Sequence, residues 1–68
     1  MKPGKYRHFK GAEYELIGVA RHSETEEECV VYRQLYGNCS WWVRPLSMFN
    51  ELVTHEGKNV KRFEWIAD

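Results

Sequence analysis

Short runs of β-branched and aromatic residues recur along this chain, and each run ends near Gly, Pro, Asn or Ser. Such punctuation is typical of strands joined by turns, whereas the apolar spacing of an amphipathic helix is almost absent. A chain of 68 residues forms a single hydrophobic core, because a domain of this size buries only about 60% of the surface that its unfolded chain exposes. The sequence therefore predicts one all-β domain spanning residues 1–68.

The turn residues divide the sequence into five or six short strands. Strands are expected in KYRHF, EYELIGVARHS, ECVVYRQLY and SWWVRPL, and ELVTHEGKNVKRFEWI is expected to form a hairpin around Glu56 and Gly57. Gly18 predicts a bulge or bend within the second strand. Ser47 is expected to cap one helical or 3₁₀ turn. This order favours a small, partly open SH3-like barrel, because closing a sheet limits the exposed edges of so short a chain.

Charge and composition restrict the partners and the location. Ten basic and ten acidic side chains cancel, so no overall field attracts the protein to nucleic acid or to an anionic membrane. No apolar run approaches the length of a membrane span, and the first residues lack the apolar core of a signal peptide. We therefore expect a cytoplasmic protein with Cys29 and Cys39 as free thiols. Because metal sites favour closer cysteine pairs, we expect no cofactor.

Five short motifs in order carry a resemblance to a known family. They are KYRHFKG, ARHSET, VVYRQLYG, WVRPLSMF and the late RF, and the match extends from Pro3 to Trp65. Together they resemble a family of very small bacterial and phage proteins known as a domain of unknown function. Glu26, Trp41 and Lys61 depart from the pattern of that family. The resemblance implies a small β-rich, barrel-like domain, and it brings no established activity, cofactor or catalytic residue.

Few residues offer catalytic chemistry. His22 and Glu24 point to one side of an extended chain, and His8 approaches them if the first two strands form a hairpin. Two imidazoles and a carboxylate are sufficient ligands for zinc or iron, so a small metal-assisted enzyme using His8, His22 and Glu24 is one alternative. A strand-end histidine with an ordinary hydrogen bond is the simpler interpretation, and we predict no metal. The absence of an activated nucleophile and of a glycine-rich phosphate loop weighs against an enzyme without deciding the question.

Aromatic and cationic residues are the more informative group. If the strands pair in order, Tyr32 and Arg44 come from adjacent strands and share one face of the sheet. Arginine beside an aromatic ring suits a planar or anionic ligand, although the same rings can equally form the core. The leading hypothesis is a non-catalytic binding module for a peptide, a protein or a nucleotide-like ligand. Its predicted ligand-binding residues are His22, Glu24, Tyr32, Trp41 and Arg44.

The expected partners follow from the same features. A protein or peptide ranks first, and a nucleotide or a short single-stranded nucleic acid ranks lower because the chain lacks the basic face that phosphates require. No membrane partner is expected. A third alternative is a structural homodimer joined at an exposed strand edge. Adjacent Trp41 and Trp42 face opposite ways, so one of them is expected to point outward or to cover a barrel end.

Overall fold

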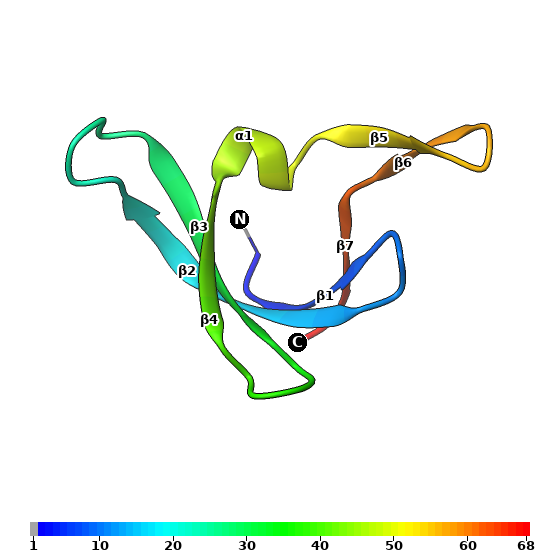
Figure 1. Cartoon of the computed structure of the whole chain (residues 1–68), viewed down its shortest axis with the longest axis horizontal. Coiled ribbons are helices and arrows are strands. Elements are labelled where there is room, and N and C mark those ends of the chain that lie inside the picture. The colour runs from blue at the N-terminus through cyan, green and yellow to red at the C-terminus, as the bar shows by residue number, and fades with distance from the viewer. Residues whose placement is uncertain (1) are drawn as a thin grey trace.

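The computed structural model describes residues 2–68, so Met1, with which the predicted domain begins, lies outside the described residues. The described chain contains strands and one short helix (Figure 1). The elements are β1 (Gly4–His8), β2 (Glu13–Arg21), β3 (Glu28–Gln34), β4 (Trp41–Pro45), α1 (Leu46–Phe49), β5 (Leu52–His55), β6 (Lys58–Lys61) and β7 (Phe63–Ala67). The predicted all-β class with a single helical turn is confirmed.

Five of the strands form one antiparallel sheet in the order β4-β3-β2-β1-β7, and β5 and β6 form a separate hairpin. Strands β4 and β7 are the two edges of the large sheet, so it is open and does not close into a barrel. The described residues contain seven strands, where the sequence predicted five or six. A specifically SH3-like arrangement stays a prediction.

The additional strand results from a bend at Arg62. The backbone N–H of Arg62 donates to the carbonyl of Glu51 at 3.0 Å, and its guanidinium pairs with the carboxylate of the same residue. This double attachment directs the chain out of the β5–β6 hairpin and into the large sheet. There β7 pairs with β1, with His8 opposite Phe63. The last run of apolar residues therefore forms two strands.

Two tight turns lie where glycine indicated them. Gly11 has a φ of 107° and donates its N–H to the carbonyl of His8 at 2.7 Å, which closes the β1–β2 turn. In the β5–β6 hairpin, Glu56 and Gly57 have φ values of 53° and 78°. Positive φ at both central residues is the signature of a type I′ turn, which matches the natural twist of a two-residue hairpin. The predicted hairpin around these two residues is confirmed.

The middle of the chain confirms one local prediction and corrects another. The register between β2 and β3 shifts between Leu16 and Gly18, which is the expected irregularity. Ser47 does not cap the helical turn. Pro45 occupies the N-cap position without a side-chain hydrogen bond, and α1 begins directly after it at Leu46. Proline suits the start of a helix because its fixed φ and missing N–H cost nothing there.

The core lies against one face of the sheet under α1. It consists of six buried side chains, to which Tyr14 and Leu46 add partly buried surface; the six are Tyr6, Leu16, Val30, Tyr32, Phe49 and Phe63. The rings of Phe49 and Phe63 stack with centroids 4.1 Å apart, which holds α1 against β7. Aromatic side chains contribute much of this core because each ring buries a large area.

Cys29 is buried and Cys39 is exposed, and both are free thiols, as predicted. No helix among the described residues has the length and apolar character needed to cross a membrane.

Candidate functional site

An aromatic concavity of about 200 Å³ lies beside the core, on the same face of the large sheet. Strands β2, β3 and β4 supply its walls, together with Tyr36 from the turn that follows β3. We call it the inner site. Its lining residues are Tyr14, Tyr32, Gln34, Tyr36, Trp42 and Arg44.

Strand alternation brings these side chains together. In β3, Tyr32 and Gln34 are two positions apart and therefore face the same way, as do Trp42 and Arg44 in β4. Tyr32 is opposite Trp42 in the register of the two strands. The indole N–H of Trp42 donates to the side-chain oxygen of Gln34 at 2.5 Å, which fixes the ring at the rim of the site.

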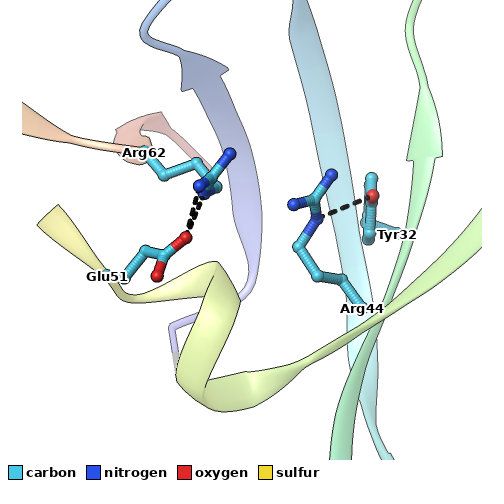
Figure 2. A network of polar contacts seen from close by, with 4 residues as sticks. All are labelled: Tyr32, Arg44, Glu51 and Arg62. Carbon is cyan, nitrogen blue, oxygen red and sulfur yellow. Dashed lines mark hydrogen bonds and ion pairs between the residues drawn. The ribbon is translucent and has the colours of Figure 1, made fainter. Parts of the chain in front are cut away.

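Arg44 supplies the charge of the inner site. Its Nε donates to the hydroxyl of Tyr32 at 3.4 Å, and its guanidinium carbon lies 5.6 Å from the centre of the Phe63 ring. Figure 2 shows how it differs from Arg62, which points to Glu51. Among residues 2–68, the ion pairs join Arg62 to Glu51 and Arg33 to Glu15, and none includes Arg44. The half-buried guanidinium of Arg44 therefore has no carboxylate partner within the described chain.

The tyrosine wall of the inner site is neutral. The hydroxyls of Tyr14 and Tyr36 share a hydrogen bond of 2.7 Å. Burial, followed by this bond to Tyr36, raises the pKa of Tyr14 to about 12. Tyr14 thus remains protonated throughout the neutral and moderately alkaline range. The wall presents hydroxyls and aromatic surface without a competing negative charge.

His22 and Glu24 lie outside the inner site, in the turn between β2 and β3. The Nδ1 atom of His22 accepts hydrogen bonds from the backbone N–H of Glu24 at 3.1 Å and of Thr25 at 3.3 Å. The backbone of His22 closes the turn. Its N–H donates to the carbonyl of Glu27 at 2.8 Å, and its carbonyl accepts the N–H of Glu26 at 2.8 Å. The hydrogen bonds that the imidazole accepts therefore stabilise the turn.

The three proposed metal ligands do not come together. His8 ends β1 next to the β1–β2 turn, while His22 and Glu24 follow the far end of β2, so the length of that strand separates them (Figure 1). The Nδ1 atom of His8 accepts the backbone N–H of Lys10 at 3.2 Å. In the described part of the chain, no three His, Cys, Asp or Glu side chains gather in the way a metal ion requires.

Comparison with known proteins places the chain in a family. The family model described as "Protein of unknown function (DUF1653)" matches residues 4–65. The chain belongs to the DUF1653 family. A crystal structure of a DUF1653 protein from Bordetella bronchiseptica is similar over 98% of this chain and 88% of that one, with 38% identity and a TM-score of 0.91. No curated protein matches.

This DUF1653 domain unites only part of the predicted site. Tyr32 and Arg44 meet in the inner site, as the pairing of adjacent strands indicated. Trp41 lies on the opposite face of β4, beside Val31 and Val43, and its neighbour Trp42 takes the position at the inner site. Both tryptophans are exposed, by 64% for Trp41 and 52% for Trp42.

Sequence reasoning missed the contribution of Gln34 and did not select Tyr14, Tyr36 and Trp42. The available signal was alternation, because Gln34 follows Tyr32 at the spacing of side chains that share a face, as Trp42 precedes Arg44. Tyr14 is opposite Gln34 in the register of β2 and β3.

Proposed function

We propose that this DUF1653 domain is a non-catalytic binding module whose inner site holds an acidic segment of a protein or peptide. In this proposal Arg44 pairs with a carboxylate of the ligand, and the aromatic residues around it contact the adjoining apolar part. The observation that carries the proposal is the half-buried guanidinium of Arg44 without an acidic partner among residues 2–68.

The chemistry of the lining supports an anionic ligand. Arg44 carries the only formal charge among the six lining residues at neutral pH. A guanidinium binds a carboxylate through two parallel N–H bonds, and these bonds are stronger in a partly desolvated site. Trp42 and Tyr36 expose ring surface beside it, which suits an apolar side chain next to the acidic one.

A protein ligand ranks above a nucleotide because the inner site contains one cation and the chain has zero net charge. Phosphate recognition generally needs several basic groups on one face. A catalytic role has less support, because the six lining residues include no histidine, cysteine or carboxylate that would act as a base or nucleophile.

The test is selection from a random peptide library, followed by affinity measurement of the enriched peptides and of versions with Glu and Asp replaced by Gln and Asn. We expect the enriched peptides to contain carboxylates. Arg44→Gln should weaken their binding by about tenfold or more, because a hydrogen bond to a charged group contributes roughly 1.5–3 kcal/mol.

Two variants serve as controls. Arg33→Gln removes a guanidinium from the same pair of strands, where Arg33 pairs with Glu15 outside the inner site. His22→Ala alters the distant turn. Both should bind like the wild type. Binding that survives Arg44→Gln, or that depends equally on Arg33, would contradict the proposal.

A further inference from the structure

Strand β4 leaves one side of its backbone without a partner. It forms an edge of the large sheet, and its neighbour on the other side is β3. The N–H of Gln34 donates to the carbonyl of Ser40 at 3.0 Å, so these two residues form a hydrogen-bonded pair at the start of the ladder. Such pairs alternate in an antiparallel ladder, which directs the backbone groups of Trp42 and Arg44 toward β3. The backbone groups of Trp41, Val43 and Pro45 consequently point away from the sheet.

The side chains on the outer face of this edge lack the usual protection against pairing, because the one charge of β4, Arg44, faces the inner site. Natural edge strands carry charges, bulges or central prolines that prevent another strand from adding to them. The side chains on the outer face of β4, away from the inner site, are Trp41, Val43 and Pro45, and Val43 is 66% exposed. Together with Val31 and Trp42, Trp41 and Val43 line a shallow apolar hollow of about 410 Å³. Pro45 interrupts the edge only at the end of the strand.

We propose that β4 pairs with β4 of a second copy of this chain, antiparallel and centred on Val43, to form a continuous sheet across a two-fold axis. The backbone groups of β4 that point away from the sheet can form the hydrogen bonds that this arrangement requires. Val43 exchanges N–H and carbonyl bonds with Val43 of the second copy, and the N–H of Trp41 donates to the carbonyl of Pro45 of the second copy. The missing N–H of proline then removes a bond only at the outer limit of the pairing.

The side chains also match across the same axis. In this register Trp42 lies opposite Arg44 of the second copy on one face, which suits a cation–π contact. Val43 meets its equivalent on the other face, flanked by Trp41 and Pro45. The outer-face side chains Trp41, Val43 and Pro45 carry no charge, so on that face the two copies bring no like charges together. Because an isologous interface must complement itself, this match favours a second copy over a foreign strand.

The first test is the oligomeric state, measured by sedimentation equilibrium over a range of concentrations. The wild type should form dimers that dissociate on dilution. Val43→Pro should be monomeric with an unchanged circular dichroism spectrum, because the N–H that it removes points away from β3. Val43→Lys should have the same effect through like charges at the axis. Ile17→Lys, at an exposed residue of β2, should remain dimeric.

A monomeric wild type at every concentration would overturn the proposal. Dimers that persist in both Val43→Pro and Val43→Lys would overturn it as well, because another surface would then be responsible. Val43 does not line the inner site, so these variants keep all six residues that line it.

The second test examines the register. Opposed residues of a hydrogen-bonded antiparallel pair have Cα atoms about 5.5 Å apart, which lies within the range that a disulfide spans. In a Cys39→Ser background, Val43→Cys should therefore form an intermolecular disulfide under mild oxidation. Ile17→Cys in the same background should not. Equal cross-linking of the two variants would contradict pairing centred on Val43.

Discussion

At the scale of single residues, His22 and Arg44 show why side chains of similar chemistry differ in what they offer a ligand. The Nδ1 atom of His22 is engaged by two backbone N–H groups of its own turn. Arg44 has a long bond to a tyrosine hydroxyl and lies over the ring of Phe63, and it has no carboxylate partner within the described chain. A sequence pattern identifies both as polar residues near strand ends. It does not contain the local hydrogen bonds that distinguish them.

His8 provides a residue-scale prediction about pH. Burial, followed by the positive charges of Arg62, Arg44 and Lys10, lowers the pKa of His8 below its ordinary value of 6.5. The unfolded chain therefore takes up this proton at a higher pH than the folded chain. The contribution to stability is fully present above pH 6.5 and is lost as the pH falls from there through the lowered pKa of the folded state.

Thermal unfolding at a series of pH values measures this effect. The melting temperature of the wild type should fall as the pH decreases below 6.5, the ordinary pKa of histidine. His8→Asn should flatten the dependence, because its side-chain oxygen can still accept the N–H of Lys10 but does not titrate. An equally steep profile in that variant would show that other groups are responsible.

At the scale of elements, strands and turns were predictable where local chemistry determines them. Gly11 and Gly57 identify two turns because their positive φ values favour glycine. Gly18 identifies the irregularity in the pairing of β2 with β3. The division between β6 and β7 was not predictable, because a contact between Arg62 and Glu51, which are distant in sequence, creates the bend. The capping role of Ser47 was predicted wrongly, since a local preference for serine yielded to a helix that starts at Leu46.

The β5–β6 turn leads to a prediction about its first central residue. Glu56 has a φ of 53°, which is unfavourable for a side chain of its kind, whereas Asn followed by Gly is strongly preferred in type I′ turns. Glu56→Asn should stabilise the hairpin by up to about 1 kcal/mol. Amide hydrogen exchange of β5 and β6 measures this change. Glu56→Gln removes the same charge and should have a smaller effect; equal effects would assign the gain to charge instead of backbone.

At the scale of the whole molecule, the inner site could be predicted only in part. The contact between Tyr32 and Arg44 follows from the pairing of consecutive strands, which a sequence indicates. The choice between Trp41 and Trp42 depends on which face of β4 turns toward the core. The turn after β3 determines that register, and a shift of one residue would exchange the two faces. The neutral net charge conveys nothing about Arg44, because its isolation is a property of the folded arrangement.

The sheet also depends on a close approach near the two ends of the described chain. A Cβ atom on Gly4 would lie 2.4 Å from the backbone oxygen of Ala67, and Gly4 has a φ of 126°. Gly4→Ala should therefore destabilise the protein by about 2–4 kcal/mol, through backbone strain and overpacking together. Chemical denaturation gives this free energy of unfolding.

Gly11→Ala is the matched control for this substitution. Gly11 has a φ of 107°, and a Cβ atom there meets no other atom within 4 Å. Its replacement should cost only the strain, about 1–2 kcal/mol. Equal losses for the two variants would contradict a specific requirement for close contact between β1 and β7.

The pairing of β1 with β7 has a consequence for the order of folding. The indole N–H of Trp65 donates to the carbonyl of Pro3, which is 62 positions earlier in the sequence. Contacts this distant in sequence close large loops, and proteins dominated by them fold slowly. During synthesis on a ribosome, β1 can pair with β2 early, but it can pair with β7 only after β7 has left the exit tunnel. Until then β1 is an exposed edge of the sheet, where strands of other chains can add to it.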